Sequence, residues 1–463
     1  MSDLVKNKTW EVVNLKDIPA RQNILRSKFV FDIKRDGGGN FQRFKARLVA
    51  MGFTQIEGVD YYETSASVMR TKTFRILISI WNNNPSFLFE HWDVKTAFVN
   101  APLDETVYVH PVKGFEPPGA VGKILLLKKA LYGTKQAAHA WQTFLAGIFC
   151  EMGAKRHVKD DCVYIFQEGD GFVFIGTHVD DLFPLCNPEG KGLRDKILRG
   201  LESKMQIENK GTLSFALDTK IERDAKRGIL KISQRAYIEN LVEEMGVENS
   251  LGRETPSSGQ ELCEEDLSQT EEEKREVEGL GVRQLIGKLW WLALMSRPDI
   301  QCALHKCAVW QNSPSHFLWK KLIHIVKYLH STRHIGLVYT SVGGGECVCD
   351  AQVDSSFGTE KDFRSRFGWF FFVCGGLVSW DTKHISRVMS SSTEAECNGL
   401  VCLGKENIWV RNFCSISPFS KRCPPRLFIK ITRRQSSFQR EQKGTVGPNI
   451  LELNLKHSKN TLS

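Results

Sequence analysis

Two adjacent acids, Asp180 and Asp181, interrupt a long apolar stretch that runs from Phe172 to Leu185. The apolar runs on both sides are typical of buried strands, which predicts a β-hairpin with the acids at its tip. Two neighbouring carboxylates are unfavourable there, because their charges repel and burial removes their hydration. A bound divalent cation offsets this penalty, since Mg²⁺ prefers hard oxygen ligands. The alternative is a solvated turn in which the two acids have no chemical role.

A third acid and a group of cations lie on other predicted strands. The segment 87–94 reads as a strand that carries Asp93. Residues 29–50 form a predicted hairpin with a Gly-rich tip. By the period of two, one face of its return strand carries Arg43, Lys45 and Arg47. Three cations on one strand face are suited to a triphosphate, although a solvated charged face explains them equally well.

The remaining pattern predicts the elements that must position these side chains. Helices are expected at 70–82, 136–152, 192–205, 233–245 and 282–295, with Ser233 as an N-cap of the fourth. Further strands are expected at 124–127 and 163–166. Polar and acidic residues between 254 and 278 predict a solvated linker, and a second β-rich unit begins near Gly343.

Composition limits the classes of protein to be considered. The chain has 463 residues, of which 41% are hydrophobic and 25% charged, which is enough for several globular domains. A formal charge of +10 fits a polyanionic partner. The thirteen Cys form no Cys-x-x-Cys pair, so no zinc site is indicated. With no apolar leader and no apolar run long enough to span a bilayer, we expect an intracellular protein, in the cytoplasm or nucleus.

Several segments, taken together, resemble the Pol polyprotein of copia-type retrotransposons in its reverse transcriptase and ribonuclease H region. The resemblance covers roughly Trp10 to Gly404, and the matching segments occur in the family's order. They are Phe44–Ala50, Gly52–Gln55, Asp93–Phe98, Leu131–Ala137, Val179–Asp181, Arg297–Ile300, Val378–Trp380 and Ser391–Glu396. No protease or integrase segment is found, so we expect a fragment of the polyprotein or a truncated copy.

The resemblance implies an α+β fold, with right-hand palm, fingers and thumb followed by a ribonuclease H-like α/β domain. The expected parts are fingers and palm (9–215), a thumb-like segment (216–253), an acidic linker (254–279), a helical connection (280–342), an incomplete ribonuclease H-like domain (343–425) and an out-of-frame, disordered tail (426–463).

The resemblance also implies the roles of individual residues in RNA-directed DNA synthesis. Asp93, Asp180 and Asp181 would bind two Mg²⁺ ions, and Lys45 and Arg47 would face the incoming deoxynucleoside triphosphate. Phe98 would exclude a ribose 2′-hydroxyl, with an ordinary core Phe as the alternative, and Gln136 would line the nucleotide pocket. The implied partners are an RNA template, a DNA primer and an RNA/DNA hybrid, with no membrane; the resemblance leaves the oligomeric state open.

The ribonuclease H-like part departs from the family at its end. Asp354 matches the first catalytic acid, with Asp350 as the competing choice, and Glu396 matches the second. After residues 427–429 the family continues with Asp-Asn, the Asp being its third acid, whereas this chain continues Lys430-Ile431-Thr432. A one-base shift of the reading frame restores Asp-Asn and also makes 446–453 resemble the family's next motif. We hypothesise that residues after Ile429 are translated out of frame, which sequencing of the locus tests.

Two functions therefore compete. The first is an RNA-directed DNA polymerase with a degenerate ribonuclease H. The second is a catalytically silent, decayed copy that only binds nucleic acid through its basic surface. An adaptor protein on an unrelated fold is a third alternative that the number of matching motifs disfavours.

Overall fold

The chain divides into two compact units, each of which we describe by itself. In this computed structural model the described residues are 2–35, 41–260, 262–268, 270–343, 348–358, 363–415 and 426–431. The first unit comprises Met1–Arg70 and Ser86–Leu213, and the second comprises Thr71–Pro85 and Ser214–Ser463. In the described part of the chain, none of the helices has the length and hydropathy that a membrane span requires.

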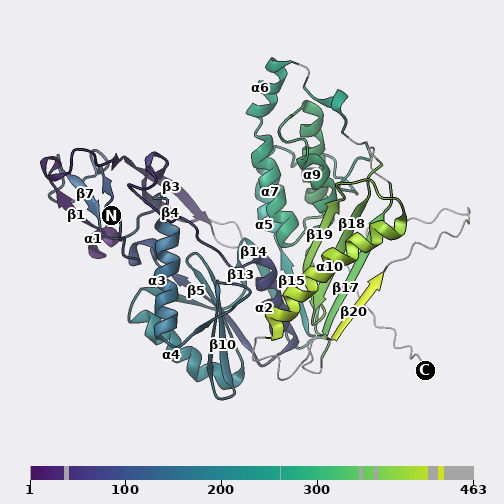
Figure 1. Cartoon of the computed structure of the whole chain (residues 1–463), viewed down its shortest axis with the longest axis horizontal. Helices are drawn as coiled ribbons and strands as arrows, with labels where there is room; N and C mark the ends of the chain where they lie inside the picture. Colours follow the sequence, from purple (N-terminus) through teal and green to yellow (C-terminus); the bar gives the residue numbers. More distant parts are fainter. Residues whose placement is uncertain are drawn as a thin grey trace, which may run out of the picture. The chain divides into compact units, whose positions relative to one another are not determined.

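The first unit is built on an antiparallel sheet of six strands, of which Figure 1 labels β5 and β10. The strand order is β12-β5-β11-β10-β9-β8. These strands are β5 (Leu88–Val94), β8 (Lys155–Arg156), β9 (Val163–Glu168), β10 (Gly171–His178), β11 (Asp181–Cys186) and β12 (Ile207–Thr212). Helices α3 (Ala137–Glu151) and α4 (Lys191–Glu202) pack against it through one apolar core that includes Trp141, Phe149 and Ile197. The hairpin predicted around the paired acids is confirmed as β10 and β11.

Two smaller sheets complete the first unit. One has the order β1-β7-β6-β2, and the other is the hairpin of β3 and β4. Their strands are β1 (Trp10–Val13), β2 (Ile24–Leu25), β3 (Ser27–Arg35), β4 (Phe41–Ala50), β6 (Tyr108–Val109) and β7 (Ile124–Leu127). The short helices are α1 (Ser2–Lys6), η1 (Leu15–Asp17), η2 (Gly52–Thr54), η3 (Ala97–Asn100) and η4 (Pro188–Gly190). The predicted hairpin at 29–50 is thereby confirmed.

The second unit contains two four-stranded sheets and most of the helices (Figure 1). The first sheet has the order β13 (Phe215–Ala216), β14 (Thr219–Asp224), β15 (Ile229–Ser233) and β16 (Leu337–Thr340). The second has the order β19 (Gly376–His384), β18 (Arg366–Val373), β17 (Val348–Ser356) and β20 (Arg426–Ile431). The helices are α2 (Thr71–Asn83), α5 (Arg235–Glu244), η5 (Glu264–Asp266), α6 (Glu271–Gly279), α7 (Val282–Met295), η6 (Pro298–Ile300), α8 (Gln301–Ala308), α9 (His316–Ser331) and α10 (Ser392–Ser415).

Helix α2 belongs to the second unit, although its sequence position lies inside the predicted fingers and palm (9–215). Its residues from Thr73 to Asn83 are all buried, so it needs partners on every side. Arg75 shows how these are supplied, because its guanidinium donates to the carbonyls of Val378 at 2.8 Å and Leu294 at 2.5 Å. The prediction of one continuous domain of fingers and palm over 9–215 is therefore wrong for 71–85, which belongs to the second unit.

The predicted acidic linker is also partly wrong, because α6 forms within it. Thr270 caps this helix by accepting a hydrogen bond from the Glu273 backbone N–H. The acids of the first turn lie at the positive end of the helix dipole, which favours them there. Val277 is fully buried against the helical core of the unit. The same acids that suggested a solvated chain thus stabilise a helix start.

Two further predicted boundaries differ from the structure. Ser233 ends strand β15, and Gln234 is the residue that precedes α5, so the predicted Ser N-cap is wrong. The predicted tail began at residue 426, but Arg426–Ile431 forms strand β20, which pairs in parallel with β17. Sheet pairing therefore extends to Ile431, while residues 432–463 lie outside the described part of the chain.

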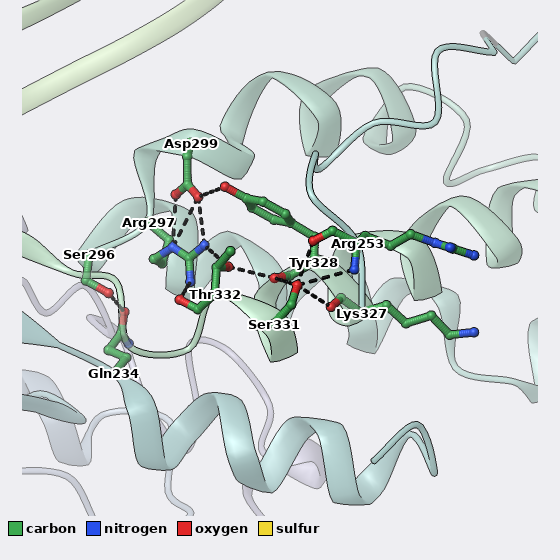
Figure 2. Close-up of polar contacts among 9 residues, drawn as sticks. All are labelled: Gln234, Arg253, Ser296, Arg297, Asp299, Lys327, Tyr328, Ser331 and Thr332. Carbon is green, nitrogen blue, oxygen red and sulfur yellow. Dashed lines mark hydrogen bonds and ion pairs between the residues drawn. The ribbon is translucent and has the colours of Figure 1, made fainter. Parts of the chain in front are cut away.

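A buried ion pair fixes the turn between α7 and α8 (Figure 2). The guanidinium of Arg297 is completely buried and donates to Asp299 at 2.7 Å, and also to the carbonyl and hydroxyl oxygens of Thr332 at 3.1 and 2.7 Å. The Tyr328 hydroxyl donates to Asp299 at 2.8 Å. Burial and the Asp299 charge raise the pKa of Tyr328 to about 12, so this donor stays protonated.

Replacing Asp299 should strongly destabilise the second unit. In Asp299→Ala, the buried Arg297 cation loses its counter-ion, and we expect a loss of about 3 to 5 kcal/mol in the free energy of unfolding. The control is Arg235→Ala, which breaks an exposed ion pair to Glu239 and should cost less than about 1 kcal/mol. Urea unfolding followed by circular dichroism measures both. If both variants lose equally little free energy of unfolding, the buried pair contributes no more to stability than the exposed one.

Candidate active site

The three predicted acids meet at one end of the six-stranded sheet. Strands β5 and β11 are antiparallel neighbours, and their register sets Asp93 directly opposite Asp181. Direct partners of this kind have Cα atoms about 5 Å apart. Asp180 precedes β11 in the hairpin turn, where its carbonyl accepts the backbone N–H of Val94 at 2.8 Å. Segments far apart in the sequence thus bring Asp93 next to the turn that carries Asp180 and Asp181.

The turn that presents Asp180 has an unusual backbone that other residues fix. Val179 has a φ of 57°, a left-handed conformation that a β-branched residue rarely adopts. The Trp141 indole N–H donates to the Val179 carbonyl at 2.6 Å, which ties the turn to helix α3. Strain at a functional turn persists only where the surroundings impose it. Here the buried indole and the β5 backbone do so.

Two of the acids contact basic side chains that the sequence analysis did not identify. Asp93 accepts hydrogen bonds from Lys95 at 2.6 Å and Lys210 at 3.1 Å. Asp181 contacts the Nε2 atom of His91 at 2.5 Å. His91 and Lys95 flank Asp93 at a spacing of two on the same strand face, a signal that would have found them. Lys210 lies on β12, and only strand pairing brings it to Asp93.

The acids influence one another electrostatically. Burial and the neighbouring Asp181 charge raise the pKa of Asp180, and the Asp93 charge adds to this effect. For Asp93, burial alone would raise the pKa, but the hydrogen bonds and charges of Lys95 and Lys210 bring it below its ordinary value. The Asp181 effect follows from its place next to Asp180, whereas the Asp93 effect places that residue within electrostatic range of the hairpin turn.

The cationic hairpin lies within electrostatic range of this cluster. Lys45 on β4 lowers the pKa of Asp180, against the stronger effects that raise it. Burial and the charges of Asp180 and Asp93 raise the pKa of Tyr132, whereas Arg47 lowers it. Arg47 also forms an ion pair with Asp32 at 3.5 Å. Lys45 therefore acts directly on one of the acids, whereas Arg47 is linked to them only through Tyr132, on which Asp180 and Asp93 also act.

The other two predicted pocket residues differ in their environment. Phe98 is partly buried, and its ring packs on Tyr132 with centroids 4.8 Å apart. Gln136 is buried, and its amide accepts from Gln55 at 3.0 Å and donates to the Asp60 carbonyl at 2.8 Å. Because the Gln136 side chain is buried and bonded at both ends of its amide, it supports the loop before α3.

The chemistry of the acids suits magnesium, but their side chains are engaged otherwise in this structure. Three carboxylates supply hard oxygen donors. Among the described residues, however, no group of three or more His, Cys, Asp or Glu side chains is arranged to hold a metal ion. The carboxylates of Asp93 and Asp181 would have to turn from their present contacts with Lys95, Lys210 and His91 to bind one.

The predicted ribonuclease acids lie on two elements of the second unit. Asp354 is exposed on β17, and Glu396 is on α10. A Cβ built on Gly399 of α10 would lie 2.9 Å from Val353, so Val353 faces this helix. Because side chains alternate along a strand, Asp354 and the competing Asp350 point to the other face. Glu396 belongs to the helix that covers the Val353 face of β17.

The raised pKa of Asp180 predicts a pH-dependent stability. A carboxyl group whose pKa is higher in the folded state destabilises the fold above that pKa, and the penalty disappears as it becomes protonated. Asp180→Asn should therefore stabilise the chain at about pH 7 by about 1 kcal/mol. The gain should shrink as the pH falls toward 3.8, the ordinary pKa. Urea midpoints across this range measure it, and a gain independent of pH would contradict the assignment.

Comparison with known proteins identifies the family. The profile of the family "Reverse transcriptase (RNA-dependent DNA polymerase)" matches residues 7–258. The Pol polyprotein from transposon TNT 1-94 of Nicotiana tabacum is 31% identical over 89% of this chain and 31% of its own length. That from transposon RE1 of Arabidopsis thaliana is 27% identical over 89% and 27%. The chain thus spans about a third or less of these relatives' length.

A solved structure was also found to be similar. The foamy viral protease–reverse transcriptase in complex with double-stranded DNA superposes with a TM-score of 0.42 and 10% identity, over 94% of this chain and 69% of that one. The sequence comparisons confirm the resemblance to copia-type Pol polyproteins. The chain belongs to the reverse transcriptase (RNA-dependent DNA polymerase) family.

Proposed function

We propose that the chain extends a DNA primer on an RNA template by nucleotidyl transfer at the cluster of Asp93, Asp180 and Asp181. The observation that carries the proposal is the strand register that sets Asp93 opposite Asp181. The family is an RNA-directed DNA polymerase. In the proposed reaction the primer 3′-oxygen forms a bond to the α-phosphorus of a deoxynucleoside triphosphate. The bond from that phosphorus to pyrophosphate breaks, and the hydroxyl proton is released.

The acids would hold two Mg²⁺ ions, which when bound would increase the acidity of the primer hydroxyl and stabilise charge on the leaving pyrophosphate. The protein's own contribution is positioning. Lys45, which acts on Asp180, and Arg47, which acts on Tyr132, would bind the triphosphate oxygens. Phe98, packed on Tyr132, would close the space that a ribose 2′-hydroxyl needs. Such catalysis depends mainly on orientation and charge stabilisation.

A catalytically silent protein is the second candidate, and one observation favours it. Lys95, Lys210 and His91 occupy carboxylate oxygens that the metal ions would need. In the silent alternative these contacts are permanent. In the polymerase they exchange for metal and nucleotide, since partly exposed ion pairs are worth only about 1 kcal/mol.

We also propose that the ribonuclease H-like part is degenerate. Asp354 and the competing Asp350 share a strand face that points away from α10, which carries Glu396. The family's third acid is absent from the sequence as it stands, where Lys430 and Ile431 follow Ile429. Hydrolysis of this kind needs its carboxylates gathered on metal ions.

Asp181→Asn should abolish primer extension. Removing one charge from the metal-binding set lowers stabilisation of the transition state, and we expect a loss of at least about 10³-fold. The matched control, Asp195→Asn, lies on α4 of the same unit and should keep activity. The assay is Mg²⁺-dependent extension of a labelled DNA primer on RNA. An inactive wild type supports the silent alternative.

A second label on the RNA tests the ribonuclease activity. Because we propose that this part is degenerate, the labelled RNA template should stay intact.

Phe98→Val should relax the choice of sugar. With a smaller side chain packed on Tyr132, we expect incorporation of ribonucleotides to rise by at least about tenfold relative to deoxynucleotides, because a steric clash is removed. Phe144→Leu, a partly buried aromatic of α3, is the control for loss of packing. Single-nucleotide extension with each triphosphate measures the ratio. An unchanged ratio would make Phe98 an ordinary core residue.

A further inference from the structure

The outer face of helix α9 is strongly basic. Between Ser315 and Gly336 the sequence has four Lys or Arg residues and no Asp or Glu. At helical spacings, one stripe along α9 carries Lys320, His324, Lys327 and Ser331. Lys320 and Lys327 are separated by about 10 Å along the axis. Both side chains reach solvent, Lys320 more fully than Lys327.

The chain segment before the acidic region docks along this stripe and adds another cation. Ser331 Oγ donates to the Arg253 carbonyl at 2.6 Å and accepts the Arg253 backbone N–H at 3.3 Å. Further along, the carbonyl of Thr255 contacts Nε2 of His324 at 3.0 Å. A Cβ on Gly252 would lie 2.8 Å from the Ser331 Cβ, so only glycine allows this close approach. The segment is thereby held against α9 with Arg253 at a fixed position.

The cations of this face are not neutralised by neighbours. Within the described part of the chain, Arg253, Lys320 and Lys327 form no ion pair. In Figure 2 the side chains of Arg253 and Lys327 extend from the polar network on the same side. Burial lowers the pKa of His324, and the charges acting on it from Arg253, Lys321 and Lys327 lower it further. Arg253 and Lys327 thus act on one imidazole ring, and a concentration of positive charge of this kind attracts an anionic partner.

We propose that Arg253, Lys320 and Lys327 form a binding site for the phosphate backbone of a nucleic-acid duplex. The site contains cations and a helix stripe but no exposed aromatic ring to stack on bases, which favours backbone contact without reading of sequence. Charge complementarity selects a polyanion, and the proposed polymerase function, on which this inference rests, supplies one in the RNA/DNA hybrid. The site would hold the hybrid whatever its sequence.

The test measures the salt dependence of hybrid binding by the full chain. The triple variant Arg253→Ala, Lys320→Ala and Lys327→Ala is compared with the wild type by fluorescence anisotropy of a labelled RNA/DNA hybrid. We expect the slope of log affinity against log salt concentration to fall by roughly 2 to 3, with a loss on the order of 100-fold at about 0.1 M salt. Hybrids of different sequence should lose affinity alike.

The control variant removes the same net charge from elsewhere. Lys196, Lys204 and Arg235 form ion pairs at 2.7, 2.7 and 2.8 Å with Glu168, Glu151 and Glu239, and their triple replacement by Ala should leave the slope nearly unchanged. Equal effects of the two triple variants, or no effect of the first, would overturn the site. An acidic protein segment as the true partner would give the latter result. Circular dichroism checks that both variants fold.

Failure of this site and failure of the proposed function give different results. Primer extension by the wild type reports on the acids, whereas anisotropy requires no catalysis. If extension is present and the slope does not change, only the α9 site is wrong. If extension is absent but the slope falls, the site stands as a nucleic-acid contact of a silent protein.

Discussion

The pairing of β5 with β11 is the constraint on which the rest of the candidate site depends. Antiparallel pairing with this register sets Asp93 opposite Asp181, and a shift by one residue would turn one of them to the other face of the sheet. The register is held by burial, because Trp92 and Leu182 are opposed and fully buried on the core face. Packing of apolar side chains against α3 and α4 therefore determines where the charged groups stand.

Carboxylates that lie close together repel one another, and nearby basic side chains reduce this repulsion. Burial raises the pKa of Asp180, and the charges of Asp181 and Asp93 raise it further. Lys95, Lys210 and His91 offset the repulsion through direct contacts with Asp93 and Asp181. Asp180 is the least compensated of the three. Under the proposed function, Asp180 is therefore the acid that would gain most from a bound Mg²⁺ ion.

The second unit buries charged side chains in its interior and supplies each with hydrogen-bond acceptors. Arg75 of α2 and Arg297 after α7 are both buried, and each donates to backbone carbonyls. Arg297 also has a buried carboxylate partner, so its charge is balanced. The hydrogen bonds of Arg75 join α2 to residues more than two hundred positions later in the chain. The unit is thus discontinuous in sequence, and the order of segments along the chain is a poor guide to its extent.

The sequence by itself determined the elements and the chemistry. Alternation predicted the hairpins at 29–50 and 172–185, and the apolar periodicity of 136–152 and 282–295 predicted helices, because these patterns reflect local geometry. The spaced motifs identified the family that the comparisons confirm. The acid-rich segment at 271–279 was misjudged, since a polar composition fits both a solvated chain and a capped helix start.

Only the tertiary structure decided which of these groups meet. His91 contacts Asp181 across 90 positions of sequence, and Lys210 reaches Asp93 from a strand that carried no catalytic motif. The Gln136 amide forms hydrogen bonds with Gln55 and Asp60, which are distant in sequence. Asp354 lies on the face of β17 opposite to the one that α10 covers. The physical reason is that local propensity depends on neighbours in the chain. Counter-ions, strand partners and the unit that α2 joins depend instead on contacts between segments that only folding brings together.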